Sequence, residues 1–258
     1  MDIAELKRTG PAGVTKRHPW ELARARVILF LLKREKKIYS RITDIGSGDA
    51  FVTEQLVKHS LAHAYTATDT AYTDEMISRV RSAGNLQDVS FFKTTDNIPR
   101  QDKSDGTLLL DVLEHCRDDS AVLADAMTLS DGNGLSIVLI TVPAFGSLFS
   151  EHDRLLGHYR RYSRTQLTKL CRSKGLEIQK SGYFFFSLLL PRIIRVLIEK
   201  WINRKPKKTI DNWPGGILLT KIISGILWTD FRVCYALSRV GIHLPGLSCY
   251  CLCKHVPS

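Results

Sequence analysis

The sequence predicts an α/β fold with a parallel sheet, and three observations support that expectation. Residues 41–51, RITDIGSGDAF, have the composition of a strand end, a glycine turn and a helix start. After this stretch, apolar runs alternate with segments of helical periodicity, which indicates strands joined by right-handed helical crossovers. Residues 106–115, GTLLLDVLEH, are predicted to form one continuous apolar strand, of the kind that parallel sheets bury on both faces.

The composition suits one substantial domain with an added subdomain, because the chain has 258 residues of which 44% are hydrophobic. A formal net charge of +11 favours an anionic partner: nucleic acid, a membrane surface or a phosphorylated substrate. Cys249, Cys251 and Cys253 alternate, which predicts small apolar residues on one face of a strand rather than a zinc site. We expect reduced thiols, no signal peptide and a cytoplasmic location.

The chain before the glycine turn is predicted to form an N-terminal helical cap over residues 1–40. Residues 19–37 have a helical pattern that ends in a basic run, and basic residues suit a helix C-terminus. Two placements are open for this helix. It packs over the glycine turn and covers a ligand there, or it closes the edge of the sheet.

The glycine turn carries the pattern D-x-G-x-G at Asp44, Gly46 and Gly48. Glycine lets the backbone turn sharply and lets a ligand approach without a Cβ in the way. The helix predicted at residues 51–59 would present free N–H groups to a polar or anionic ligand. A tight turn without a ligand has the same local pattern. The residues downstream are therefore needed to distinguish a ligand-binding turn from a purely structural one.

Acidic residues follow the next strands. Asp69 ends the strand predicted at residues 64–69, roughly twenty residues past the glycines, where nucleotide-binding folds place a carboxylate on the ribose hydroxyls. The alternative for Asp69 is a helix cap. Asp96 follows a short strand at residues 89–95 and either accepts from an adenine amino group or serves as a turn residue.

Three polar residues, Asp111, Glu114 and His115, end the strand predicted at residues 106–115, and polar groups at this end face the ligand crevice of such sheets. With these residues the sequence resembles the Rossmann-like (class I) S-adenosylmethionine-dependent methyltransferases over residues 41–143. The positions that match the cofactor-binding motifs of that family are Asp44, Gly46, Gly48, Asp69, Asp96 and Asp111. Ala50 departs from the pattern, because many members carry a third glycine there, but alanine is small and the turn is expected to survive.

The resemblance implies a sheet of about seven mostly parallel strands, with the last one antiparallel and helices on both faces. It also implies S-adenosyl-L-methionine as cofactor and S-adenosyl-L-homocysteine as product. A dinucleotide oxidoreductase is the rival interpretation, but its G-x-G-x-x-G pattern needs a glycine where this chain has Phe51. Asp44 also suits a methionine ammonium group better than a pyrophosphate, because like charges repel.

Residues 142–167 resemble a segment, SEHD followed by GHYRRY, of a bacterial subgroup of these methyltransferases often encoded near genes for polysaccharide or lipid modification. The resemblance implies a cap over the methyl-transfer site. The matching positions are Ser150, Glu151, His152, Asp153, His158, Arg160, Arg161 and Tyr162. A salt-bridged surface loop is the alternative. Ser163 and Gln166 then predict a capping box at the next helix.

A hydroxyl acceptor would need a general base, and histidine is the usual one near neutral pH. The candidates are His115, His152 and His158, with His152 favoured because its neighbours Glu151 and Asp153 could hold an imidazolium. No metal ligands are expected. The substrate-binding candidates are Glu151, Asp153, Arg160, Arg161 and Tyr162. The two arginines either bind a phosphate or carboxylate or pair with the two acids.

The sixth strand is predicted at residues 175–186 and the seventh at residues 246–256, with an insertion at 187–244 between them. We expect a methyltransferase core at residues 41–186 and 245–258. The insertion contains two basic amphipathic helices, separated at residues 203–216, that suit an anionic membrane surface but are too interrupted to span a bilayer. A lid and a dimer interface are the alternatives.

The sequence therefore predicts a methyltransferase acting on a small-molecule, glycan or lipid-linked acceptor, cytoplasmic or peripheral at the inner membrane face. A nucleic-acid or protein methyltransferase and a non-catalytic scaffold that retains the pocket are the alternatives. Nucleic acid is disfavoured because the sequence lacks the Asn/Asp-Pro-Pro-aromatic motif for flipped bases and any added RNA-binding module.

Overall fold

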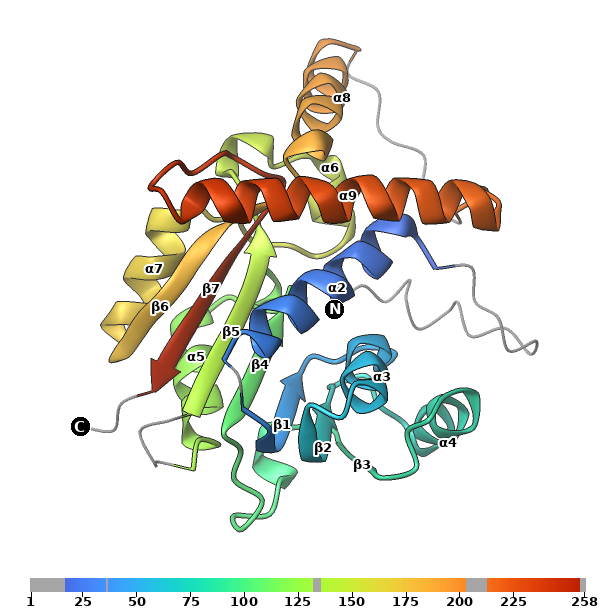
Figure 1. Ribbon diagram of the computed structural model, residues 1–258, viewed down its shortest axis with the longest axis vertical. Helices are drawn as coiled ribbons and strands as arrows, with labels where there is room; N and C mark the ends of the chain where they lie inside the picture. The colour runs from blue at the N-terminus through green and yellow to red at the C-terminus, as the bar shows by residue number, and fades with distance from the viewer. Residues whose placement is uncertain (1–16, 36, 132–135, 203–212, 256–258) are drawn as a thin grey trace.

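The computed structural model describes residues 17–35, 37–131, 136–202 and 213–255. A seven-stranded sheet in the order β3-β2-β1-β4-β5-β7-β6 forms its centre, and only β7 runs antiparallel to its neighbours (Figure 1). The strands are β1 (Tyr39–Ile45), β2 (Ala62–Thr68), β3 (Val89–Phe92), β4 (Gly106–Leu110), β5 (Ser136–Pro143), β6 (Leu176–Phe184) and β7 (Ser248–His255). The predicted sheet, with its antiparallel last strand, is confirmed.

Helices cover both faces of the sheet, as predicted. The helices are α2 (Pro19–Lys33), α3 (Phe51–Lys58), α4 (Asp74–Ala83), α5 (Asp119–Thr128), α6 (Glu151–Leu155), α7 (Arg164–Ser173), α8 (Leu189–Ile202) and α9 (Ile217–Ser238). One apolar cluster joins the sheet to α2, α3 and α9, and a second joins its other face to α5 and α7. Alternate residues of β5 enter the two clusters, since successive strand side chains point to opposite faces.

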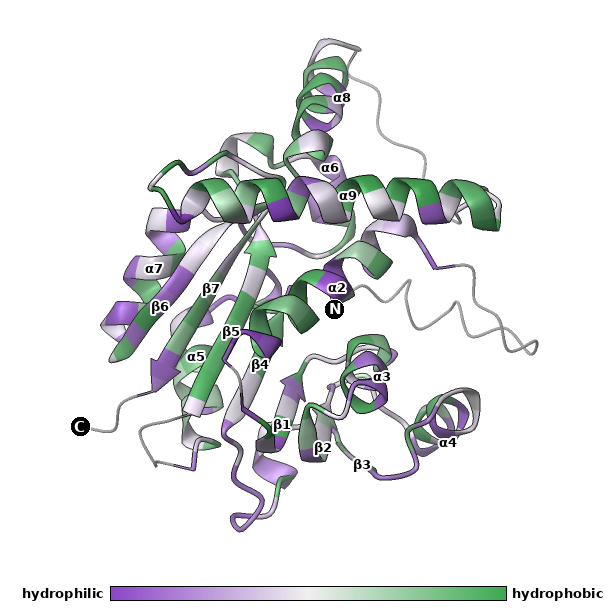
Figure 2. Cartoon of the chain, viewed as in Figure 1, coloured by the Kyte–Doolittle hydropathy of each residue, from purple (hydrophilic) through white to green (hydrophobic). Residues whose placement is uncertain are grey.

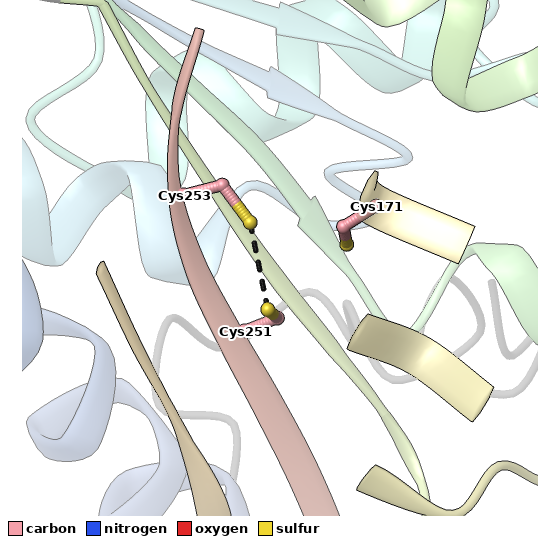
Figure 3. Close-up of side chains that lie close together, drawn as sticks. All are labelled: Cys171, Cys251 and Cys253. Atoms are coloured by element: carbon pink, nitrogen blue, oxygen red, sulfur yellow. Dashed lines mark hydrogen bonds between the residues drawn. The ribbon is translucent and has the colours of Figure 1, made fainter. Parts of the chain in front are cut away.

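The alternating cysteines of β7 lie on one face of the strand, as their spacing predicts. Cys249, Cys251 and Cys253 are buried against α7 in the second apolar cluster, whereas Tyr250 and Leu252 between them enter the first. Figure 3 shows Cys251 and Cys253 side by side along the strand with Cys171 of α7 facing them. All six cysteines of the chain are free thiols in the structure.

Strand β4 is shorter than predicted, because it ends at Leu110 rather than at His115. Asp111 leaves the extended conformation with φ +57°, and its N–H donates to Thr141 O of β5 at 2.9 Å. Residues Leu113–His115 then form the short 3-10 helix η2. The apolar run continued past the strand because Leu113 is itself fully buried, so hydrophobicity did not mark the strand end.

The glycine turn after β1 depends on left-handed backbone conformations. Gly46 and Gly48 have φ +68° and +60°, and Ala50 adopts φ +57° at the start of α3. The turn therefore survives with alanine in the third position, as expected. A Cβ added to Gly46 would lie only 2.6 Å from Cγ2 of Val112, which follows β4. The glycine turn therefore packs closely against the loop after β4, and a side chain at position 46 would not fit between them.

The long segment between β6 and β7 forms α8 and α9. Both helices lie on the side of the molecule toward which the carboxyl ends of the parallel strands point (Figure 1). Helix α9 is apolar on two opposite sides. Ser224, Leu227, Phe231 and Cys234 are its buried residues. Its outer side and one side of α8 expose large apolar residues, drawn green in Figure 2. This outer apolar face consists of Leu190, Ile194, Leu197, Ile198 and Trp201 on α8 and Leu218, Ile222, Ile226 and Val233 on α9.

Among the described residues, no helix combines the length and hydropathy needed to cross a bilayer. Helix α2 ends at Lys33, four residues earlier than predicted, and packs against α9. The capping box predicted at Ser163 and Gln166 is present at the start of α7. The division of the chain into a cap, a core and an insertion stays a prediction.

We expect Gly46→Ala to lower the free energy of unfolding by about 3 kcal/mol, because it combines left-handed strain with overlap on Val112. Gly175→Ala is the matched control. Gly175 has φ +76° with no atom within 4 Å of an added Cβ, so we expect a loss of about 1 kcal/mol. Urea denaturation measures both values, and equal losses would show that the contact with Val112 is unimportant.

Candidate active site

The glycine turn after β1 lies beside the end of β2, so the first two predicted motifs come together. The N–H groups of Gly46 and Ser47 donate to Thr68 O at 2.8 and 3.0 Å. The N–H of Gly48 donates to Oδ2 of Asp69 at 3.1 Å. The carboxyl ends of these parallel strands thus form a single edge, which is where open α/β sheets bind ligands.

Asp44 is buried at this edge, with 2% of its surface exposed. Thr53 of α3 donates its hydroxyl to Oδ2 of Asp44 at 2.7 Å. In the described part of the chain, no donor lies within hydrogen-bond distance of the other oxygen, Oδ1. Burial raises the pKa of Asp44 to about 7, although the bond from Thr53 opposes this change. A cationic ligand on Oδ1 would supply the missing partner.

Asp69 is held at the end of β2 by two backbone donors, Gly48 on Oδ2 and Ala71 on Oδ1 at 2.9 Å. Burial raises its pKa, and these two bonds counteract the rise. The helix-cap alternative is wrong, because the cap of α4 is Thr73, whose hydroxyl accepts from Met76 N at 3.2 Å. Asp69 instead joins the turn after β1 to the turn after β2.

Tyr72 is a residue at this edge that the sequence analysis missed. Its hydroxyl lies 2.7 Å from Oγ of Ser47 in the glycine turn, and its ring packs edge-on against Phe91 with 5.5 Å between centroids. Burial raises the pKa of Tyr72 above its ordinary value. The only signal in the sequence was its place three residues after Asp69, because its contacts are made by residues of other elements.

Helix α2 packs beside the glycine turn, and its predicted role as a cover over a ligand there stays a prediction. Arg17, just before the helix, lies 4.2 Å from the ring centroid of Phe51 and pairs with Asp49. Arg24 of α2 pairs with Asp111 at the end of β4. These contacts bring positive charge from α2 to the acidic edge of the sheet.

The two remaining cofactor candidates differ in their surroundings. Asp111 accepts from Thr141 Oγ1 at 3.0 Å and pairs with Arg24, so it belongs to the edge. Asp96 is exposed and lies in the short 3-10 helix η1 (Thr95–Asn97) after β3. Its carboxylate therefore lies in a turn that is open to solvent, and its predicted role stays a prediction.

Glu114, His115 and His158 form a cluster just beyond Asp111. Each offers one ligand atom, and these three atoms lie within 4.8 Å of one another. The two imidazole rings meet edge-on with 4.6 Å between centroids. Burial and the Asp111 carboxylate raise the pKa of Glu114 well above its usual value. Burial and the nearby His158 lower the pKa of His115 to about 3, so His115 is neutral near pH 7.

Asp153 is fully buried and organises the segment after β5. Its Oδ1 accepts from Arg161 Nε at 2.8 Å and lies 3.1 Å from Nδ1 of His158. Its Oδ2 accepts from Arg192 of α8 at 2.6 Å and from Ser150 N at 2.9 Å. Burial opposes ionisation, but the bond from His158 and the charges of both arginines hold the pKa of Asp153 well below its usual range.

The hydrogen bond to Asp153 also fixes the tautomer of His158. An ionised carboxylate can only accept, so Nδ1 of His158 carries a hydrogen, and in the neutral form of the ring the lone pair is on Nε2. The two acidic neighbours of His152, the histidine favoured from the sequence, have other partners, and the role of His152 as a base stays a prediction. Asp153 serves His158, Arg161 and Arg192, and Glu151 pairs with Arg154.

Arg160, Arg161 and Tyr162 have partners within the protein. Arg160 pairs with Asp119 of α5 at 3.0 Å and donates to Cys116 O at 3.1 Å. The hydroxyl of Tyr162, which is buried, donates to Oδ2 of Asp119 at 2.6 Å. Arg161 pairs with Asp153. The expected pairing with the two neighbouring acids therefore holds for Arg161, whereas Arg160 pairs with Asp119 instead, and the substrate roles of both arginines stay predictions.

The arrangement of the fold has counterparts among solved structures. A protein solved in complex with the Haloferax volcanii Trm112 methyltransferase activator matches with a TM-score of 0.55 at 14% identity, over 93% of this chain and 95% of that chain. The methyltransferase domain of bacterial CtHen1 matches with a TM-score of 0.53 at 12% identity, over 91% and 99% of the two chains. The chain has the class I methyltransferase fold.

A third counterpart of this methyltransferase fold is the N-methyltransferase NodS of Bradyrhizobium japonicum, solved with S-adenosyl-L-homocysteine. It matches with a TM-score of 0.52 at 16% identity, over 70% of this chain and 88% of that chain. No protein-family model matches the sequence, and no curated protein matches it significantly. The likeness is therefore one of fold, and the function has to be argued from the site.

We expect Asp153→Asn to lower the free energy of unfolding by about 3 kcal/mol or more, because it leaves the buried Arg161 and Arg192 without their counter-charge. Glu151→Gln, in the same helix, is the control. Its exposed pair with Arg154 should contribute less than about 0.5 kcal/mol. Chemical denaturation compares the two, and a small loss for Asp153→Asn would contradict a structural role for the carboxylate.

Proposed function

We propose that the protein is an S-adenosyl-L-methionine-dependent methyltransferase. The observation that carries this proposal is the bare oxygen Oδ1 of Asp44, buried beside a glycine turn in a methyltransferase fold. The ammonium group of the cofactor's methionine part is a cation that this oxygen could bind. Asp69 lies at the neighbouring strand end, where its carboxylate can accept from the ribose hydroxyls. Asp96, after β3, is the candidate for the adenine amino group.

The protein's part in the reaction is to hold the two reactants and to manage charge. S-adenosyl-L-methionine supplies an activated methyl group when bound. Gly46 and Gly48 let the backbone approach the ligand, and α2 covers the turn through Arg17 and Arg24. The cluster of Glu114, His115 and His158 lies beyond Asp111, so these side chains would face the acceptor.

We favour a small-molecule, glycan or lipid-linked acceptor over a nucleic acid or a protein. The solved counterparts have varied acceptors, so the fold does not select one. Calorimetry with S-adenosyl-L-methionine and S-adenosyl-L-homocysteine tests the function first, because a catalyst should bind both and a scaffold without the activity neither. Mass spectrometry of lipid and glycan extracts with and without the gene then identifies the acceptor by a loss of about 14 mass units, one CH2.

The affinity for S-adenosyl-L-methionine should rise with pH up to about 7, because Asp44 must lose its proton to bind an ammonium group. Below that pH we expect a decrease of about tenfold per unit. The stability of the protein without ligand should depend on pH in the opposite direction. The native state holds this proton more tightly than the unfolded chain, so the contribution of Asp44 to stability falls as pH rises from about 4 to about 7.

Calorimetric titrations between about pH 5 and pH 7 measure this dependence. Asp44→Asn should bind the cofactor more weakly and without the pH dependence. Asp105→Asn is the control, because Asp105 lies near the amino ends of β1 and β4, where it contacts Lys37 and Ser40. A pH-independent affinity in the wild-type protein would contradict the assignment of Asp44.

We also propose that the outer apolar face of α8 and α9 rests on an anionic membrane surface. Trp201 is 90% exposed, and several other large apolar residues of the face are more than half exposed. Arg195 on α8, Lys221 on α9 and Arg239 just after α9 supply positive charge, and the whole chain carries +11. Exposed apolar side chains combined with basic residues are the features by which amphipathic helices bind anionic lipid.

Liposome sedimentation tests this proposal. The protein should sediment with vesicles containing phosphatidylserine at low salt and remain in solution with neutral vesicles. Replacing both Leu197 and Trp201 by aspartate should weaken the binding by about tenfold or more, since each buried large side chain contributes about 1.5–3 kcal/mol. Ile38→Asp is the control, because Ile38 is an exposed apolar residue before β1 and outside the outer apolar face. Equal binding of all variants would contradict the proposal.

A further inference from the structure

The cluster of Glu114, His115 and His158 has the composition of a metal site. Glu114 and His115 are neighbours in η2, and His158 comes from the segment after α6, so two separate parts of the chain supply the three side chains. Their ligand atoms lie within 4.8 Å of one another. Two imidazoles and one carboxylate form a common ligand set for divalent transition metals, which leaves several coordination positions open.

Glu114 provides a second, independent observation that points to a cation at this cluster. Glu114 is only 1% exposed, and within the described ranges no hydrogen-bond donor reaches its Oε2. A buried carboxylate oxygen without a partner is costly, because burial removes the water that would otherwise solvate it. The neighbouring Asp111 already pairs with Arg24, so Glu114 is the carboxyl group of this region whose oxygen lacks a partner in the described chain. A divalent cation bound here would offset the negative charge of an ionised Glu114.

The surroundings of His158 are those expected around a metal-binding histidine. Ligating histidines usually donate their second ring N–H to a carboxylate or carbonyl, which fixes the ring and directs the lone pair to the metal. Nδ1 of His158 lies 3.1 Å from Oδ1 of Asp153, which leaves Nε2 as the ligand atom. Arg161 and Arg192 fix Asp153 in turn. The buried ion cluster thereby holds one ligand in place.

We propose that Glu114, His115 and His158 bind a divalent transition-metal ion whose open positions receive the methyl acceptor. This differs from the sequence analysis, which expected no metal. The role of the ion rests on the proposed methyltransferase function. The bound ion would lower the pKa of a coordinated acceptor hydroxyl, whose proton would go to solvent. The oxygen would then form its bond to the methyl carbon while the carbon–sulfur bond breaks and the sulfur keeps the electron pair, which would give S-adenosyl-L-homocysteine and a methyl ether.

The ion also narrows the class of acceptor. A cation with more than one open position binds two oxygens of the same molecule better than one, because the second contact costs little additional entropy. We therefore expect an acceptor with a hydroxyl beside a second oxygen atom, such as a vicinal diol of a sugar or a catechol. A single isolated hydroxyl or an amine would gain less from this site.

The second group of potential ligands in the described chain, Cys171, Cys251 and Cys253, has a different character (Figure 3). All three thiols are buried in the apolar cluster between α7 and the sheet, and Sγ of Cys251 lies 3.4 Å from Sγ of Cys253. Thiolates select soft ions, whereas carboxylate and imidazole also accept Mn²⁺. A manganese probe therefore distinguishes the two groups.

Electron paramagnetic resonance of the wild-type protein titrated with Mn²⁺ alone tests the proposal. We expect one bound ion per chain, with the affinity lowered at least about tenfold in Glu114→Gln and in His158→Asn. His59→Asn, at an exposed histidine outside the cluster, should leave the affinity unchanged. Thermal melts confirm that each variant is folded. No binding by the wild-type protein, or equal binding by all four proteins, would overturn the proposal.

Nuclear magnetic resonance of the wild-type protein gives the same test without a substitution. Bound Mn²⁺ should broaden the ring signals of His115 and His158 and leave those of the exposed His59 and His63 sharp. Broadening of all four, or of neither cluster histidine, would contradict the site. Because both experiments omit S-adenosyl-L-methionine, they can fail while cofactor binding succeeds, and the two proposals are tested separately.

Discussion

A group of acidic side chains, three of them buried, at one edge of the sheet is the constraint on which the rest of the structure depends. Asp44, Asp69, Asp111 and Glu114 all lie at or just beyond the carboxyl ends of β1, β2 and β4. A carboxylate removed from water needs a counter-charge or hydrogen-bond donors, or its pKa rises. Backbone amides serve Asp69 and Arg24 serves Asp111. One oxygen of Asp44 and one of Glu114 lack a partner in the described protein.

These two oxygens connect the two functional proposals. The ammonium group of S-adenosyl-L-methionine would give Oδ1 of Asp44 a positively charged partner. A metal ion would do the same for Oε2 of Glu114. The overall charge of +11 does not remove the need, because the basic side chains near this edge already have acidic partners. Ligands would therefore contribute to the stability of the native state as well as to chemistry.

A second ionic cluster links the site to the rest of the chain. Asp153 binds Arg161 beside the site and Arg192 on α8, and it also orients His158. Helix α8 carries part of the outer apolar face proposed to contact lipid. The same carboxylate therefore holds a site side chain and the first helix of the proposed membrane surface in one arrangement. A lipid-linked acceptor would meet both at once.

Much of this fold could be predicted from the sequence, because it depends on local patterns. Apolar periodicity located the strands and helices, the D-x-G-x-G pattern located the turn, and alternation placed the cysteines of β7 on one face. The pairing of Asp153 with Arg192 could not be predicted, because Arg192 is 39 positions away and meets it only through tertiary packing. The early end of β4 was hidden because Asp111 turns while the apolar run continues.

A crystal structure of the protein with S-adenosyl-L-homocysteine tests the central claim most directly. The account predicts that the amino group of the ligand's homocysteine part lies within hydrogen-bond distance of Oδ1 of Asp44. It also predicts the ribose hydroxyls on Asp69 and the sulfur directed toward the cluster of Glu114, His115 and His158. A ligand bound elsewhere, or an Asp44 that contacts only protein atoms in the complex, would contradict it.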